Sequence, residues 1–340
     1  MPLEYVCNWL CETINYNQLL TVLRTAMFTR AHLLGFIALL ALFAVHAKPV
    51  PAQTPATPAL VGRWDLTVHG SGGDYPSWLE VWTSGASHLV GQFVGRGGSA
   101  RPISRIEFTN GTMRFSIPPQ WDKRPDDETY EATLKGEKLE GWTTDPAGKR
   151  IAWSGVMAPS LARTGSPTWG EPVALIAASS LAGWREPNKG WKVASGVLSS
   201  VGAADNLVST PTFGDFKVHV EFRLPKGSNS GVYLRGRYEV QIEDSDAAEP
   251  PLDHMGGIYG FLATTRDTRR KPGEWQTFDV TLVGRIVTVE MNGIRVICER
   301  EIPGITGGAL DSDEASPGPL MLQGDHGAIE FRNILVSPGR

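Results

Sequence analysis

An excess of charge of one sign is missing from this sequence. Its 32 Lys and Arg stand against 36 Asp and Glu, which gives a net charge of −4, and the two signs are interleaved along the chain. Proteins that bind nucleic acid carry a clustered basic face, because they must neutralise phosphates. Nucleic acid is therefore not expected as a partner.

Cysteine is also scarce. Of the three cysteines, Cys7 and Cys11 lie near the N-terminus, and only Cys298 follows residue 47. A mature chain beginning after residue 47 would have no internal disulfide. Cys298 alternates with apolar residues in an expected strand, and this environment favours a small buried hydrophobic residue over a nucleophile.

No apolar run reaches the roughly twenty residues that a membrane-spanning helix needs. The first long run, 33–45, follows Arg30 and ends in Ala-Val-His-Ala, which is typical of a secretory signal peptide. We interpret 27–47 as this signal and 1–26 as an extension from a misassigned start; an uncleaved anchor stays open. The expected location is periplasmic or extracellular, with no stable membrane span after cleavage.

The composition instead favours short strands. The chain has 38 Gly and 11 Trp and few helix-period runs. Residues 48–59 form a proline-rich linker. About eight short strands follow in 60–161, which predicts a small antiparallel β barrel or sandwich, an accessory domain that could help to shape a substrate cleft.

Strands resume after a Gly- and Pro-containing boundary at 162–172. The dipeptide Asn292-Gly293 is the strongest hairpin signal in the chain, because both central residues of a type I′ turn need positive φ. Residues 173–338 could hold two antiparallel sheets of about six strands each, packed as a jelly-roll sandwich. The predicted fold class is all-β.

Three expected strands between 216 and 243 alternate apolar with polar residues. Such alternation places apolar side chains on one face of a strand and ionisable ones on the other. If these strands pair with one another, their polar faces merge into one surface that could hold a sugar or a catalytic carboxylate. The last strand, at 328–334, repeats this pattern, so its polar side chains are expected in the same hollow.

These stretches resemble a known family, the 3-keto-disaccharide hydrolase domain, over about 173–338. The motifs that carry the resemblance are Asn-Ser-Gly-Val-Tyr-Leu-Arg at 229–235, Tyr-Glu-Val-Gln-Ile at 238–242, Gly-Ile-Tyr-Gly at 257–260 and Leu-Gln-Gly-Asp-His-Gly at 322–327. The resemblance implies a concanavalin A-like jelly roll. It also implies cleavage of glycosides whose glucose ring carries a ketone at C3.

A ketone at C3 acidifies the hydrogen on C2. A general base can then remove that proton, donors can stabilise the enolate, and the C1 substituent can leave before water adds. With the resemblance, this chemistry suggests Glu239 or His326 as the base and Arg235 and Gln241 as donors. The candidates for substrate binding and orientation are Glu221, Asn229, Tyr259, Gln323, Glu330 and Arg332.

No cofactor is assigned with certainty. Glu239, Glu221, Asp325 and His326 offer ligands that Ca²⁺ or Mn²⁺ accepts, so a divalent metal stays open. Two other functions also stay open. One is a secreted lectin-like protein that binds carbohydrate without cleaving it, and the other is a structural envelope protein.

Overall fold

The computed structural model describes residues 59–340 apart from 122, 178 and 245–249. Thr57–Arg340 form one compact unit. The predicted signal peptide and extension lie outside the described residues. No helix among the described residues is long and apolar enough to cross a membrane.

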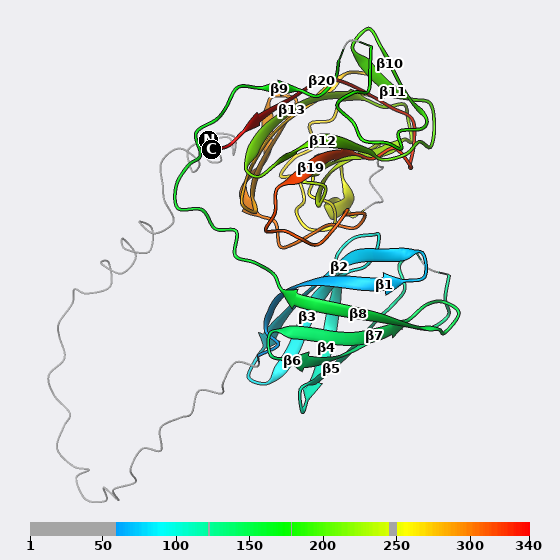
Figure 1. The fold of residues 1–340 in the computed structure, drawn as a ribbon, viewed down its shortest axis with the longest axis vertical. Helices are drawn as coiled ribbons and strands as arrows, with labels where there is room; N and C mark the ends of the chain where they lie inside the picture. Colours follow the sequence, from blue (N-terminus) through cyan, green and yellow to red (C-terminus); the bar gives the residue numbers. More distant parts are fainter. Residues whose placement is uncertain (1–58, 122, 178, 245–249) are drawn as a thin grey trace, which may run out of the picture. The chain divides into compact units, whose positions relative to one another are not determined.

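The first part of this unit is a closed antiparallel barrel (Figure 1). The sequence analysis left a barrel and a sandwich open, and the structure has the barrel. Each strand pairs with the next in sequence, and the first pairs with the eighth to close the ring. Inward side chains such as Trp64, Phe93 and Trp153 fill the barrel as a separate apolar core. The strands are β1 (Gly62–Gly70), β2 (Gly73–Ser84), β3 (His88–Val94), β4 (Arg101–Thr109), β5 (Thr112–Ile117), β6 (Glu128–Lys135), β7 (Lys138–Thr144) and β8 (Arg150–Met157).

The second part consists of two antiparallel sheets of unequal size. The larger sheet has eight strands and the smaller has four, so the prediction of about six in each is wrong. The larger sheet contains β9 (Val173–Ala174), β10 (Trp191–Ala194), β11 (Val197–Ser200), β13 (Phe216–Arg223), β16 (Gln276–Val283), β17 (Ile286–Met291), β18 (Ile294–Glu301) and β20 (Ile329–Pro338). The smaller sheet has the order β12 (Leu207–Phe213), β19 (Gly318–Leu322), β14 (Asn229–Leu234) and β15 (Tyr238–Glu243).

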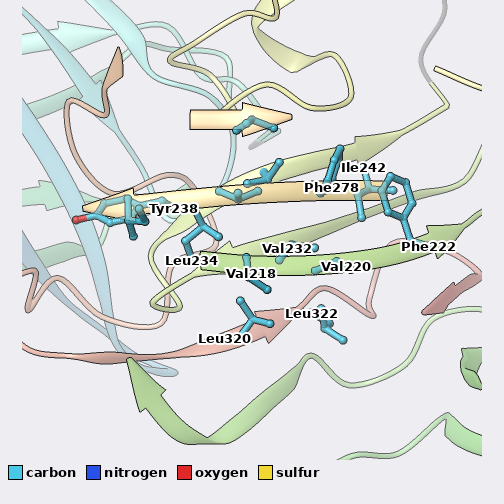
Figure 2. Packing of buried hydrophobic residues seen from close by; sticks show 14 of the residues in the cluster. Val218, Val220, Phe222, Val232, Leu234, Tyr238, Ile242, Phe278, Leu320 and Leu322 are labelled. Atoms are coloured by element: carbon cyan, nitrogen blue, oxygen red, sulfur yellow. The ribbon is translucent and has the colours of Figure 1, made fainter. Parts of the chain in front are cut away.

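The apolar side chains of the two sheets form a common core. Val218, Val220 and Phe222 of β13 belong to the same buried cluster as Val232 of β14 and Leu322 of β19 (Figure 2). Their alternation with polar residues is the pattern that the sequence analysis identified. The prediction of an all-β chain with a barrel before a sandwich is therefore confirmed.

One expectation about these strands is wrong. The strand at 216–223 does not pair with the next two in sequence, because β13 lies between β20 and β16 in the larger sheet while β14 and β15 pair in the smaller one. The chain passes from one sheet to the other between Arg223 and Asn229. The polar sides of β13 and β15 consequently belong to different sheets.

The barrel and the sandwich are in direct contact. Trp78 of β2 is fully buried in the sandwich cluster and meets Phe261 edge-on with 5.3 Å between ring centroids. A Cβ on Gly304 would lie 2.1 Å from Nε1 of Trp78, so the backbone packs directly on the indole. Cys298 in β18 is half-buried, not fully buried as expected.

Candidate functional site

A cavity of about 460 Å³ opens on the outward face of the four-stranded sheet. This volume lies within the roughly 300–1,000 Å³ of small-molecule sites. We call it the cleft. It is lined by Gly97, Gly98, Trp121, Asn229, Tyr233, Glu239, Gln241, Glu243, Pro250, Asp253, Tyr259, Gly307, Gly308, Gln323 and His326.

The register of β14 and β15 places the polar residues of these strands in the cleft. Tyr233 lies opposite Glu239, and Asn229 lies opposite Glu243, while Val232 and its partner Val240 alternate with them and belong to the core. Directly opposed residues of an antiparallel pair share one face. The odd-numbered side chains of this hairpin therefore form the floor of the cleft.

Glycine at position 231 makes room for the carboxyl group of Glu239. A Cβ at Gly231 would lie 2.2 Å from Oε1 of Glu239 and 2.9 Å from its Cγ. Any other residue would have to displace this side chain. Gly308 has a similar role above Tyr233, because a Cβ there would lie 2.6 Å from the phenol oxygen.

Tyr233 and Glu239 form the buried centre of the site. The phenol oxygen of Tyr233 lies 2.9 Å from Oε2 of Glu239 and 3.0 Å from the carbonyl oxygen of Gly307. A phenol has one proton to donate. Tyr233 donates this proton to Oε2 of Glu239 or to the carbonyl oxygen of Gly307.

The electrostatics favour the protonated form of Glu239. Burial, the largest cause, and repulsion from Glu243, Asp325 and Asp253 together raise the pKa of Glu239 from 4.5 to about 8, against the lowering effect of the Tyr233 hydrogen bond. Burial together with Glu239 also raises the pKa of Tyr233 well above 10. At neutral pH this site holds a carboxylic acid that can donate a hydrogen bond.

A loop pairs with the free edge of β15 and brings Tyr259 to the cleft. The amide nitrogen of Gln241 donates to the carbonyl of Gly257 at 3.0 Å, and that of Tyr259 donates to the carbonyl of Glu239 at 3.1 Å. These bonds satisfy backbone groups that a sheet edge would leave unpaired. The loop thereby positions Tyr259 beside the floor strands.

His326 and Gln323 come from the segment that follows β19. Nδ1 of His326 lies 2.7 Å from Oδ1 of Asp325, which orients the ring and leaves Nε2 as its second nitrogen. Gln323 is 8% exposed. Its Nε2 donates to the phenol oxygen of Tyr233 at 3.4 Å, and its Oε1 has no hydrogen-bond partner among the described residues. A buried amide oxygen left in this way at a cleft wall is a ready acceptor for a ligand hydroxyl.

Six of the ten predicted site residues meet in the cleft. They come from β14, β15, the loop beside β15 and the segment after β19, and they are Asn229, Glu239, Gln241, Tyr259, Gln323 and His326. The side-chain oxygen of Gln241 is already engaged within the protein, because its Oε1 accepts a hydrogen bond from the backbone N–H of Ile242 at 3.0 Å.

Arg235 does not join them. It is 1% exposed, and its guanidinium donates to the phenol oxygen of Tyr238 at 3.0 Å and to the carbonyl of Gly284 at 2.9 Å. It follows β14 with φ of 53°, so the alternation of the strand no longer fixes its direction. Among the described residues that line the cleft there is no Lys or Arg.

Glu221, Glu330 and Arg332 belong to the outward face of the larger sheet. Arg332 donates to Glu221 at 2.6 Å, and Arg223 pairs with Glu330. The guanidinium of Arg332 also stacks on Trp275, 4.0 Å from the ring centroid. The expectation that the last strand's charges share a hollow with Glu239 is wrong, because β20 and β15 are in different sheets.

The proposed metal ligands do not come together either. Glu221 is in the larger sheet, away from the other three, and no group of three or more His, Cys, Asp or Glu suited to a metal occurs in the described part of the chain. The residues present do not fit the predicted site.

Sequence reasoning missed several lining residues: Trp121, Tyr233, Glu243 and Asp253. For Tyr233 and Glu243 a signal existed, since they share the odd-numbered parity of Glu239 and Gln241 along the two strands. Trp121 comes from a barrel loop far away in sequence, and no pattern indicated it.

Comparison with known proteins supports the motif analysis. Residues 171–337, slightly under half of the chain, match the family model of the 3-keto-alpha-glucoside-1,2-lyase-like domain, which confirms the resemblance. No curated protein matches the chain.

Solved structures with some similarity include two Parabacteroides distasonis proteins, both provisionally described as glycosyl hydrolases. One is 26% identical and covers 52% of this chain and 92% of its own, with a TM-score of 0.42. The other is 24% identical and covers 50% and 100%, with a TM-score of 0.41. The carbohydrate-binding module CBM66 of Bacillus subtilis is 13% identical and covers 46% and 95%, with a TM-score of 0.32.

Proposed function

We propose that this chain, whose residues 171–337 form a domain of the 3-keto-alpha-glucoside-1,2-lyase-like family, cleaves glycosides that carry a ketone at C3 of the glucose ring. The family match indicates a carbohydrate-active, glycosyl hydrolase-like domain. The specificity for 3-keto sugars is our proposal, and the composition of the cleft supports it.

The reaction needs a base and a donor. The base removes the proton on C2, and the electrons of that C–H bond form an enolate whose charge rests on the C3 oxygen. The enolate then collapses to a ketone and a C1–C2 double bond as the C1–O bond breaks, and the leaving oxygen takes a proton. Addition of water across the new double bond completes net hydrolysis.

His326 is the base in this proposal. Its Nδ1 is held by Asp325 at 2.7 Å, so the neutral ring presents Nε2 as the proton acceptor. The histidine is about half exposed and lines the cleft, where a bound sugar can reach it. Asp325 stabilises the imidazolium that forms after proton transfer, as a carboxylate does in serine hydrolase triads.

Glu239 is the donor to the developing enolate oxygen. A carboxyl group with a pKa near 8 is mostly protonated at neutral pH and can donate without being a cation. Gln241 and Tyr259 line the same cleft and would help to position the ring.

The observation that carries the proposal is this buried neutral acid in one cleft with a histidine oriented by an aspartate. A glycosidase of the usual kind would instead use two carboxyl groups on either side of the glycosidic bond. An elimination next to a ketone needs one base and one oxyanion donor, which is what the cleft offers.

The test follows cleavage of 3-keto-trehalose by the wild-type protein and two variants. We expect release of a monosaccharide, with a primary isotope effect when C2 carries deuterium. His326→Ala should lower kcat by about 10²- to 10⁴-fold. The wild-type rate should fall as the pH rises through about 8, because Glu239 then loses its proton, and Glu239→Gln should lack this fall.

Each arm can fail separately. A rate that rises towards pH 8 and is abolished in Glu239→Gln would make Glu239 the base. Binding of the disaccharide without release of a monosaccharide would favour the lectin-like alternative. Cleavage of unoxidised trehalose at a comparable rate would reject the proposed substrate class.

A further inference from the structure

We infer that the barrel completes the substrate site, and that Trp121 is the stacking platform for the sugar that leaves from C1. This inference rests on the proposed function, and it assigns a specificity-determining residue outside the family domain. It also gives the barrel a role in choosing the substrate.

The barrel reaches the cleft through the connection between β3 and β4. The amide nitrogen of Gly308 donates to the carbonyl of Arg96 at 3.0 Å. A Cβ on Gly307 would lie 2.3 Å from the carbonyl oxygen of Gly98, and a Cβ on Gly260 would lie 2.7 Å from the Cα of Ser99 and from the amide nitrogen of Ala100. Backbone packing this close fixes the connection against two loops of the sandwich.

Trp121 lies next to the connection between β3 and β4. A Cβ on Gly98 would lie 2.6 Å from its indole nitrogen. The preceding residue, Gln120, donates from Nε2 to the hydroxyl of Ser99 at 2.8 Å and ties its own segment to the same connection. Trp121 therefore belongs to the rigid rim of the cleft although it comes from the barrel.

The exposure of Trp121 has no structural benefit among the described residues. The side chain is 73% exposed and is absent from both apolar cores. An indole left in water forgoes the large gain that burial of an aromatic side chain brings. Aromatic residues exposed at a cavity are typical anchors for ligands. One face of a pyranose carries C–H groups only and can cover the indole.

The geometry of the floor decides which sugar Trp121 meets. Glu239 comes from β15 and His326 from the segment after β19, so the oxidised ring must lie over the four-stranded sheet. Trp121, Gly97 and Gly98 line the barrel side of the same cavity. A disaccharide whose reacting ring occupies the floor extends its second ring towards this side.

Stacking of an unreactive ring has a defined kinetic signature. The second sugar is held equally in the ground state and in the transition state, so losing the contact raises KM and leaves kcat unchanged. For a substrate without the second ring, the loss of Trp121 should leave kcat and KM unchanged. A change in the catalytic groups would instead alter the kinetic constants for both substrates.

The experiment compares 3-keto-trehalose with methyl 3-keto-α-glucoside for three proteins. Trp121→Ala should raise KM for the disaccharide about tenfold, with kcat and both constants for the methyl glycoside within twofold of wild type. Trp82→Ala is the matched control, because Trp82 is a 38% exposed barrel residue outside the lining of the cleft. This variant should leave kcat and KM unchanged for both substrates.

Equal KM values for wild type and Trp121→Ala with the disaccharide would overturn the inference. A fall in kcat with both substrates would also overturn it, since that would assign Trp121 to the reaction itself. If the wild-type protein cleaves neither compound, the proposed function fails, and calorimetric titration with 3-keto-trehalose decides the subsite. Binding that is weakened in Trp121→Ala but not in Trp82→Ala supports it, and equal binding rejects it.

Discussion

The outward faces of the two sheets carry the same residue types and behave in opposite ways. Glu239 on the smaller sheet is 3% exposed, and burial raises its pKa to about 8. Glu221 on the larger sheet also experiences some burial, but hydrogen bonds from Asn333 and Arg332 outweigh it and lower its pKa. One glutamate is held as an acid and the other as a carboxylate.

The neighbours of each carboxyl group explain the difference. Glu221 accepts 2.6 Å hydrogen bonds from Arg332 and from the amide of Asn333, which satisfy its charge. Glu239 has Tyr233 as its donor and acidic groups nearby. Loops and the barrel cover the face around Glu239, whereas the salt bridges around Glu221 remain partly open to water. Covering by distant segments turns a polar sheet face into a site.

The largest expected effect separates these two glutamates. Glu239→Ala should lower kcat for 3-keto-trehalose by about 10²- to 10³-fold, the usual cost of removing one donor to a developing oxyanion. Glu221→Ala is the matched control and should leave kcat within twofold, because its side chain lies on the other sheet. Steady-state kinetics with both purified variants would measure this.

Equal losses of activity in the two variants would break the comparison, because they would show that the polar face of the larger sheet takes part in turnover. Circular dichroism spectra should accompany the kinetics. They ensure that a loss of fold is not mistaken for a loss of catalysis.

A smaller effect should follow from crowding Glu239 without removing it. Gly231→Ala places a Cβ only 2.2 Å from Oε1 of Glu239, so the carboxyl group must move. We expect kcat to fall about tenfold, because a misplacement near 1 Å is costly in a preorganised site. Gly214→Ala is the control, since no atom lies within 4 Å of its added Cβ.

A Gly231→Ala protein with wild-type kcat would mean that the position of Glu239 is not critical. In that case its proposed role as donor would have to be abandoned. A loss of activity in Gly214→Ala would show that the assay responds to general perturbation of the sandwich.

Strand alternation was sufficient to predict which side chains of a strand share a face. Val218, Val220 and Phe222 are in the core, and Glu239 and Gln241 are opposite it, as the period of two requires. Alternation does not say which sheet a strand joins. The segment between Arg223 and Asn229 takes the chain to the other sheet, and no residue pattern there distinguishes this crossing from a hairpin.

Other parts of the site depend on contacts that are distant in sequence. Arg235 looked like a continuation of β14, but its positive φ takes it out of the alternation and into the interior. Trp121 lies more than a hundred residues before the strands that it joins at the cleft. The placement of Trp121 follows from how the barrel packs on the sandwich, and single-sequence patterns contain no information about that packing.

The last contrast is how the two glutamates link pH to stability. The pKa of Glu239 is raised in the folded state, so its stabilising contribution is complete below pH 4.5 and is lost as the pH rises towards 8. The pKa of Glu221 is lowered, so its contribution is present above pH 4.5 and is lost as the pH falls through its folded value. The two slopes have opposite signs.

Urea unfolding between pH 3 and 9 can resolve them. Glu239→Gln should remove the fall in the free energy of unfolding that accompanies a rise in pH from 4.5 to about 8. Glu221→Gln should remove an acid loss below about 1 kcal/mol in total, because its ion pair is partly screened by water. If both variants flattened the same limb of the curve, the two carboxyl groups would share one environment. The contrast between the sheet faces would then have no electrostatic basis.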